Sequence, residues 1–175
     1  MRVIAGELRS RRLKTVPGLD TRPTPDRLRE SLFNILAPRI EGLIFLDAYA
    51  GTGAVGIEAL SRGAARAIFI ERSRKAVEVL RENLASLSLT ARADLIQGRV
   101  LHHLPNYRAD IVFLDPPYEL EGEYAEALNL LSGAPLVIAQ HAARLRLAPA
   151  YGRFAHTRTV RHGDNALSFF EVNSP

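Results

Sequence analysis

From residue 43 onward, short apolar runs alternate with segments of helical periodicity, and this rhythm leaves few folds open to the chain. The segments 54–62 and 73–84 carry apolar residues at helical spacing. A strand-helix-strand alternation of this kind predicts a parallel sheet covered on both faces by helices, with right-handed crossovers. The strand-like runs cover residues 43–46, 67–70, 93–96, 110–114 and 135–139.

The C-terminal segment departs from this alternation. Residues 154–160 and 166–172 are strand-like and are separated by Gly163, Asp164 and Asn165, a pattern typical of an antiparallel hairpin. We therefore expect an α/β fold in which a doubly wound, mostly parallel sheet of seven strands ends in an antiparallel hairpin. Residues 41–175 would form this domain, and residues 1–40 would add a basic extension made of a small hairpin and a helix.

Composition excludes several classes of protein. The chain has 175 residues, 47% hydrophobic and 24% charged, which is typical of one globular domain. No apolar run approaches the ~18 residues needed to cross a bilayer, and the first residues do not resemble a signal peptide, so we expect a cytoplasmic protein without membrane contact. The absence of cysteine excludes thiol chemistry, and the five histidines lack the spacing of metal ligands, so no metal is expected.

Positive charge is concentrated at the N-terminus. Residues 1–40 hold nine basic and four acidic side chains, and the remainder of the chain is close to neutral. A cationic segment can neutralise backbone phosphates, which makes nucleic acid the leading partner, although a merely solvated face is the alternative. The candidates for phosphate contact are Arg9, Arg11, Arg12, Lys14, Arg22 and Arg27.

Within this extension, residues 3–5 and 13–16 predict a small hairpin. Thr24 followed by Pro25 predicts the start of a helix, with Thr24 as its N-cap. The apolar residues of this helix then fall on one face, with Arg27 and Arg29 pointing elsewhere.

A glycine-rich segment follows the first strand of the expected sheet and opens a helix. Gly51, Gly53 and Gly56 satisfy the pattern G-x-G-x-x-G, which is weak evidence alone. Glu71 lies 20 residues after Gly51, at the end of the second strand, where a carboxylate can accept hydrogen bonds from ribose hydroxyls. Together these features predict a nucleotide-like ligand.

The acid at the end of the first strand narrows the choice of ligand. Asp47 would lie close to the pyrophosphate of a dinucleotide at this helix N-terminus, and like charge there argues against NAD. S-adenosylmethionine has no phosphate and carries a cationic amino group and a cationic sulfonium, so Asp47 would favour it. The segment is not a P-loop, because it contains no Lys.

A second motif, Asp115-Pro116-Pro117-Tyr118, closes the fourth strand and so emerges at the same edge of the sheet. The Asp115 carboxylate and a backbone carbonyl of the proline turn can accept the two N–H groups of an amine conjugated to a ring. Such contacts aim the lone pair of the nitrogen at a methyl group. Tyr118 offers an aromatic face on which a flipped-out base can stack.

With these motifs in place, the sequence resembles the RsmD family, bacterial methyltransferases of the guanine N2 in small-subunit ribosomal RNA. The resemblance covers nearly the whole chain. It rests on the segments 2–6, 22–34, 47–63 and 115–118 and on the Gly163-Asp164-Asn165 turn.

The resemblance implies the class I fold of S-adenosylmethionine-dependent methyltransferases, acting on 16S ribosomal RNA within a 30S subunit or an assembly intermediate. Nothing in the sequence argues strongly for more than a monomer. Asp115, Pro116, Pro117 and Tyr118 would be the catalytic segment. Many members carry Asp or Asn after the third strand to contact the adenine amine, where this chain has Arg99. That contact stays open: Gln97 or a backbone group substitutes, or adenine is held mainly by packing. The remaining cofactor-binding residues would be Asp47, Tyr49, Gly51 and Gly53 for the methionine part and its loop, and Glu71 for the ribose.

Two other functions remain open. An adenine-N6 methyltransferase of DNA or RNA could use the same motif at residues 115–118, and a non-catalytic RNA-binding assembly factor could retain a vestigial cofactor site.

Glu58 and Arg62, four residues apart on a helix, are expected only to pair with each other. Asn83 is expected to cap a helix.

Overall fold

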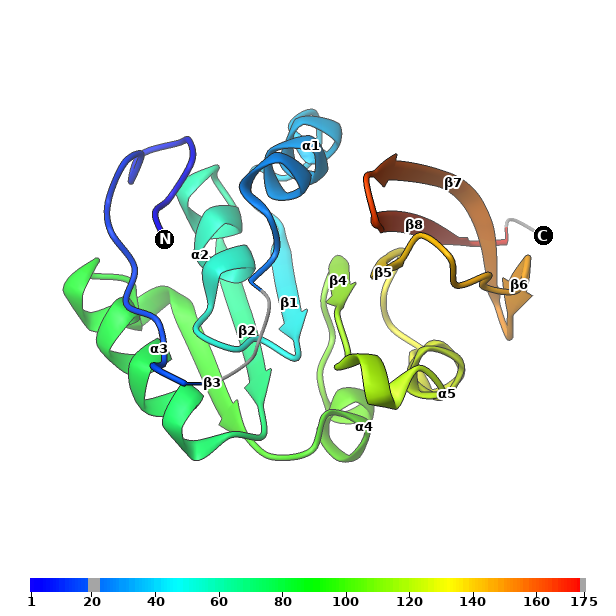
Figure 1. The fold of residues 1–175 in the computed structure, drawn as a ribbon. Coiled ribbons are helices and arrows are strands. Elements are labelled where there is room, and N and C mark those ends of the chain that lie inside the picture. Colours follow the sequence, from blue (N-terminus) through cyan, green and yellow to red (C-terminus); the bar gives the residue numbers. More distant parts are fainter. Residues whose placement is uncertain (19–22, 174–175) are drawn as a thin grey trace.

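The expected alternation of strands and helices is present in the computed structural model, which describes residues 1–18 and 23–173 (Figure 1). The strands join one sheet in the order β3-β2-β1-β4-β5-β8-β7-β6. The five strands β1 to β5 are parallel, and β8, β7 and β6 continue the sheet antiparallel. Their bounds are β1 Ile44–Ala48, β2 Arg66–Glu71, β3 Ala93–Gln97, β4 Ile111–Leu114, β5 Leu136–Ala142, β6 Ala150–Tyr151, β7 Phe154–His162 and β8 Asn165–Val172.

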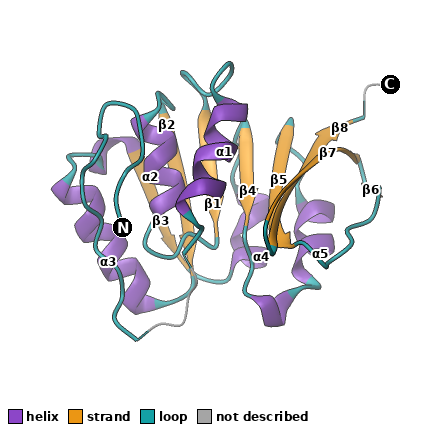
Figure 2. Ribbon diagram, turned by 45° about the horizontal axis from the view of Figure 1, so that its top comes forward, coloured by secondary structure: helices purple, strands orange, loops and turns teal. Residues whose placement is uncertain are grey.

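Helices cover both faces of the sheet (Figure 2). The first three helices pack on one hydrophobic cluster, and α4 and α5 pack on a second cluster across the sheet. No helix of the described residues is long and apolar enough to cross a membrane. The helices are α1 Asp26–Leu36, α2 Ala54–Ser61, α3 Arg74–Ser86, α4 Val100–His103 and α5 Glu123–Leu130, with 3-10 turns at Thr90–Arg92, Leu104–Asn106 and Tyr118–Leu120.

The strand order places a topological switch point between β1 and β4. The chain runs outward from β1 to β2 and β3, then returns to start β4 on the other side of β1. The loops after β1 and β4 therefore diverge at the carboxyl edge of the sheet, which is where open α/β sheets bind ligands. The doubly wound sheet and its terminal hairpin are as predicted.

Three local expectations differ from the structure. The sheet of the described residues has eight strands, because the two-residue β6 adds an outer edge to the hairpin. The N-terminal hairpin is reduced to one antiparallel bridge between Arg2 and Arg12. Thr24 does not cap α1, since its hydroxyl donates instead to the side-chain oxygen of Gln140 at 3.0 Å. The division of the chain at residue 40 stays a prediction.

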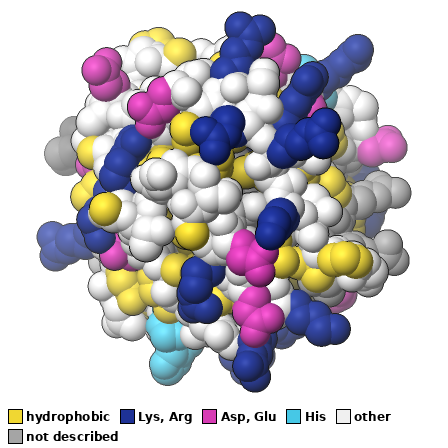
Figure 3. All heavy atoms as spheres, turned by 90° about the vertical axis from the view of Figure 1, so that its left-hand side faces the viewer, with side chains coloured by type: hydrophobic (Ala, Val, Ile, Leu, Met, Phe, Trp, Pro, Cys, Tyr) yellow, Lys and Arg dark blue, Asp and Glu magenta, His cyan; other side chains and the backbone are white. Residues whose placement is uncertain are grey.

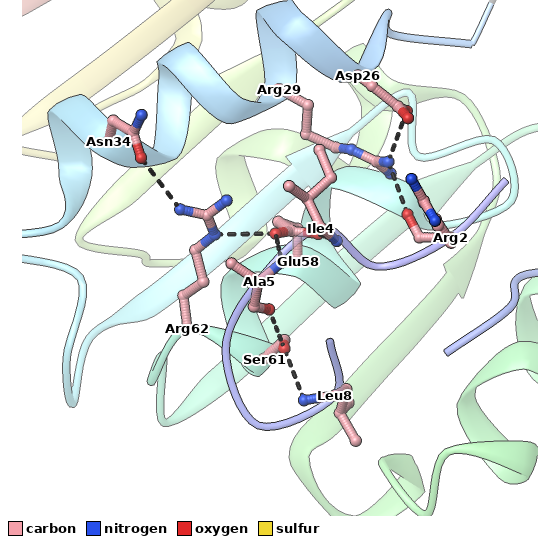
Figure 4. A network of polar contacts seen from close by, with 10 residues as sticks. All are labelled: Arg2, Ile4, Ala5, Leu8, Asp26, Arg29, Asn34, Glu58, Ser61 and Arg62. Atoms are coloured by element: carbon pink, nitrogen blue, oxygen red, sulfur yellow. Dashed lines mark hydrogen bonds and ion pairs between the residues drawn. The ribbon is translucent and has the colours of Figure 1, made fainter. Parts of the chain in front are cut away.

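The N-terminal residues dock on α2 through a buried carboxylate (Figure 4). Glu58 has no exposed surface and accepts hydrogen bonds from the backbone N–H of Ile4 at 2.9 Å and of Ala5 at 3.0 Å. Arg62 donates to the same carboxylate at 2.8 Å. The expected pair of Glu58 and Arg62 is present, but the expectation that pairing was its whole role is wrong.

Two further contacts tighten this docking. The hydroxyl of Ser61 donates to the carbonyl of Ala5 at 2.6 Å and accepts from the N–H of Leu8 at 3.0 Å (Figure 4). Arg29, expected away from the apolar face, is fully buried and donates to the carbonyl of Arg2 at 2.8 Å. Burial lowers the pKa of Arg29, and the negative charge of Glu58 opposes that shift.

Substituting Glu58→Ala should both destabilise the protein and release its first residues. The substitution leaves two backbone N–H groups and the guanidinium of Arg62 without their negative partner, and it removes a negative charge that acts on the buried Arg29. Breaking a buried ionic network costs about 3–5 kcal/mol. We expect the free energy of unfolding, measured by urea titration, to fall by about 3 kcal/mol or more, with faster tryptic cleavage after Arg9 to Arg12. Exposed Glu41→Ala is the matched control, and equal stability of the two variants would contradict this interpretation.

Candidate active site

The loop between β1 and α2 is fixed by a carboxylate inside the sheet. Asp47, next to last in β1 and 2% exposed, accepts the backbone N–H of Gly56 at 2.9 Å. Gly56 is the third residue of α2, so this carboxylate acts on the N-terminus of the helix, where N–H groups lack partners within the helix. The contact joins strand, loop and helix into one rigid unit.

The three glycines of the loop have different tasks. A Cβ on Gly53 would lie 2.1 Å from the side chain of Leu80, and one on Gly56 would lie 2.3 Å from the ring of Phe69. These two glycines therefore allow α2 to pack closely on its neighbours. Gly51 has open space where its Cβ would lie, so it is required by its left-handed backbone, with a φ of +58°, and not by close packing.

Glu71, at the end of β2, binds the same loop. One of its carboxylate oxygens accepts the N–H of Gly51 at 2.7 Å, and the other accepts the N–H of Ser73 at 2.7 Å. Each carboxylate oxygen has a second lone pair, so Glu71 can still accept from a ligand hydroxyl. The sequence predicted the position of Glu71 at this strand end but not its bond to the loop.

Asp115 follows the last residue of β4, whose neighbour in the sheet is β1. Burial raises the pKa of Asp115 to about 7. Burial likewise raises the pKa of Asp47, and the negative charges of Asp115 and Glu71 raise it further, against the effect of the Gly56 N–H. Asp47 thus lies close enough to Asp115 and Glu71 to be repelled by both, an arrangement that a bound cation would relieve.

The residues after Asp115 form a short rigid turn. The carbonyl of Pro117 accepts the N–H of Leu120 at 2.8 Å, so it is engaged within the turn. The carbonyl of Pro116 has no backbone N–H partner among the described residues outside helices and strands. Tyr118 is 49% exposed, an unusual position for a large aromatic side chain, and it stands at the rim of the site.

Two predicted cofactor residues have structural surroundings that the sequence did not reveal. Tyr49 has a φ of +65°, and its hydroxyl donates to the carboxylate of Glu123 on α5, so its polar end is already in use. Arg99 is exposed and immediately precedes α4, one residue beyond Gly98, whose N–H bonds the carbonyl of Glu71 at 3.0 Å. Both residues border the loops at the carboxyl edge.

Asn83 is a supporting residue that sequence analysis misassigned as a helix cap. It lies buried on α3, and its amide donates to the carbonyl of Thr52 in the glycine loop at 3.0 Å and to the carbonyl of Lys14 at 3.1 Å. Its side-chain oxygen accepts the N–H of Lys14 at 2.8 Å. An Asn among the buried positions of an amphipathic helix was the signal that it serves other backbone segments.

Lys and Arg side chains are scattered over the face that carries α3, with acidic side chains among them (Figure 3). The ammonium of Lys14 contacts Glu82 at 2.7 Å, and Arg11 donates to the carbonyl of Ser86 at 3.1 Å. Arg9 and Arg12 are exposed. Arg27 is exposed on α1, and Arg22 lies outside the described residues.

Comparison with known proteins places this site in a family. The model of the family "Conserved hypothetical protein 95" matches residues 1–171. The chain belongs to this family.

Relatives of this family member carry names that concern RNA methylation. A Bacillus subtilis protein, YlbH, provisionally named an rRNA methyltransferase, is 35% identical over 98% of each chain. Ribosomal RNA small subunit methyltransferase D of Escherichia coli is 42% identical over 75% of this chain and 66% of its own length. The E. coli protein yhhF, whose solved structure is provisionally named a methyltransferase, aligns with a TM-score of 0.87 at 35% identity over 100% of this chain and 99% of its own. The fold is that of class I methyltransferases.

In this family member, Asp115→Asn should stabilise the fold in a pH-dependent way. The pKa of Asp115 is about 7 in the folded protein and about 3.9 in an unfolded chain. The folded state therefore binds the extra proton between about pH 4 and pH 7, and stability falls as pH rises through that window. Calorimetry should give the variant a Tm about 3 °C or more above wild type at about pH 8 and no gain near pH 4.

The control is Asp164→Asn, in the exposed turn of the hairpin. A gain in Tm that is the same at both pH values would mean that the Asp115 charge is not the source of the stabilisation.

Proposed function

We propose that this chain transfers a methyl group from S-adenosylmethionine to the exocyclic N2 of a guanine in small-subunit ribosomal RNA, within an assembling 30S particle. The observation that carries the proposal is the meeting of Asp47 and Asp115 at the switch point of a methyltransferase fold, with the proline turn and exposed Tyr118 beside them. The names of the relatives support ribosomal RNA as the substrate.

The donor set of the site fits S-adenosylmethionine. A ligand with a sulfonium and an ammonium suits a buried carboxylate that two neighbouring carboxylates repel, whereas the phosphates of a dinucleotide would add to the repulsion. We assign Asp47, with the loop around Tyr49, Gly51 and Gly53, to the methionine part and Glu71 to the ribose. Adenine would lie at the turn before α4, where Arg99 stands. When bound, S-adenosylmethionine supplies a methyl group on a sulfonium that leaves as a neutral thioether.

The substrate amine is held by the turn after β4. Asp115 would accept one N–H of the guanine amino group and the carbonyl of Pro116 the other, since the carbonyl of Pro117 is already bonded to Leu120. These contacts hold the base with its amino lone pair aimed across the crevice, where that pair forms the new N–C bond. The nitrogen then loses a proton, and the Asp115 carboxylate, with a pKa of about 7, is placed to accept it. Tyr118 stacks on the flipped base.

The function is tested by offering radiolabelled S-adenosylmethionine with unmodified 30S subunits, naked 16S RNA and duplex DNA, followed by nucleoside analysis. Label in N2-methylguanosine from the ribosomal substrates is the expected result. Label in N6-methyladenine would keep the reaction type and overturn the substrate base. Measurable cofactor binding with no transfer to any substrate would contradict catalysis and favour an assembly factor.

The Asp115→Asn variant should lower turnover by about 10²-fold or more, by analogy with the loss of one preorganised transition-state contact. The same variant is expected to be the more stable protein above neutral pH, so lost activity would not reflect unfolding. Steady-state kinetics with 30S subunits measure the effect, with Asp164→Asn as the control. Near-normal turnover would refute the role of Asp115.

Asp47→Asn should weaken binding of S-adenosylmethionine about tenfold, because it removes a buried negative charge close to the ligand cations. The asparagine oxygen can still accept the N–H of Gly56, so the loop should keep its conformation. Isothermal titration with S-adenosylmethionine and with adenosine, which carries neither the ammonium nor the sulfonium, separates the two effects. Equal weakening for both ligands would indicate a distorted loop instead of a lost charge contact.

A further inference from the structure

A groove of about 610 Å³ lies between α1 and β7, within the roughly 300–1,000 Å³ typical of ligand sites. Figure 2 shows α1 in front of the sheet and β7 at the curved end of that sheet, beyond β5 and β8. Neither the glycine loop nor the Asp115 turn contributes to its walls, so this groove is separate from the site described above. The side chains that matter here are Arg27, Glu30 and Ile35 from α1 and Arg158, Val160 and His162 from β7.

Two regular elements present these side chains. Arg27, Glu30 and the polar residues Ser31 and Asn34 recur at helical spacing and share one face of α1. The residues of β7 alternate, so positions 158, 160 and 162 share one face of the strand. The groove is therefore built on rigid scaffolding.

The groove has apolar residues on its floor and charged residues on its walls. Ile35 and Val160 are partly buried against the hydrophobic core, which gives the groove an apolar floor. The exposed guanidinium groups of Arg27 and Arg158 stand on opposite walls, and Glu30 is the single acid among the lining residues. Cations on the walls and apolar groups on the floor suit a strand that carries phosphates outside and sugars and bases inside.

One end of the groove opens at the active-site edge of the sheet. His162 pairs with Asn165, which pairs with Ala142, the last residue of β5. On the other wall, Thr24 precedes α1 by two residues and bonds Gln140 of β5. Arg27 and His162 therefore lie at the carboxyl edge, where Asp115 also lies, and Asn34 and Arg158 lie farther along the groove.

We propose that this groove binds the single-stranded RNA segment next to the target guanine, with Arg27 and Arg158 on its phosphates. The inference rests on the proposed function and adds a substrate track to it. A base delivered to Asp115 must be extruded from its strand, and the adjoining nucleotides need a surface that begins at the same edge. The sequence identified Arg27 as a candidate, but it gave no reason to select Arg158 or His162, which are far from it along the chain.

The test measures binding of a fluorescein-labelled single-stranded RNA oligonucleotide by anisotropy over a range of salt concentrations. The variants are Arg27→Ala, Arg158→Ala, their combination and Glu30→Gln, and the control is Arg81→Ala on the exposed side of α3. The double variant should bind about tenfold or more weakly, and its log-log salt slope should become shallower by about 1.4, since each single-strand phosphate contact contributes about 0.7. Glu30→Gln should tighten binding about twofold, because it removes repulsion.

Tighter binding by Glu30→Gln is a change that a merely damaged surface would not produce. Affinity and salt slope equal to those of wild type in the double variant would overturn the groove as an RNA site. Loss of affinity for a duplex of the same sequence, but not for the single strand, would overturn the assignment to single-stranded RNA, as would failure of the wild-type protein to bind the oligonucleotide.

This outcome is independent of the methylation assay. If the labelled product is N6-methyladenine, the assignment of guanine as the target base is wrong, but the proposal that the groove binds RNA is unaffected. If N2-methylguanosine forms normally and the Michaelis constants of the variants for 30S subunits are unchanged, the groove fails and the proposed function stands. Titration with S-adenosylmethionine should give wild-type affinity for every groove variant, because none of these residues lines the cofactor crevice.

Discussion

The hydrogen bond from the N–H of Gly56 to the buried carboxylate of Asp47 is the contact on which the site depends. A carboxylate inside a sheet is costly, and its pKa rises with burial, but the N-terminus of α2 supplies both a donor and a favourable dipole. The bond holds α2 so close to β2 and α3 that Gly53 and Gly56 have no room for a side chain. It also holds the Asp47 carboxylate next to the crevice, where its negative charge can attract a cationic ligand.

The same helix is held by a second buried carboxylate farther along. Glu58 binds two backbone N–H groups of the N-terminal segment, and Asn83 joins that segment to the glycine loop through Lys14 and Thr52. The basic N-terminus and the glycine loop are therefore held by the same two helices, α2 and α3. A ligand bound at the loop and an RNA bound at the N-terminus would both contact segments that α2 supports, which gives α2 a structural role at both sites.

The carboxyl edge of the sheet gathers groups with different tasks. Asp47 and Asp115 come from neighbouring strands that end side by side, and Tyr118 stands exposed next to them. The terminal hairpin turns back at this edge and brings His162 toward α1. The hairpin therefore has a second role besides completing the sheet. One face of β7 forms a wall of the groove, and this groove begins at the carboxyl edge where Asp115 lies.

The sequence by itself determined the order of elements and the two motifs of the crevice, because hydrophobic period and turn residues are local signals. It also implied that Asp47 and Asp115 would meet, since parallel strands end at one edge. Only the tertiary structure decided the burial of Arg29, the partners of Glu58 and Asn83, and the placement of Arg158 and Arg27 on the walls of one groove. These features bring together residues that lie far apart in the sequence. Hydrophobic periodicity is a local property, so it cannot predict which polar side chain binds a distant backbone segment.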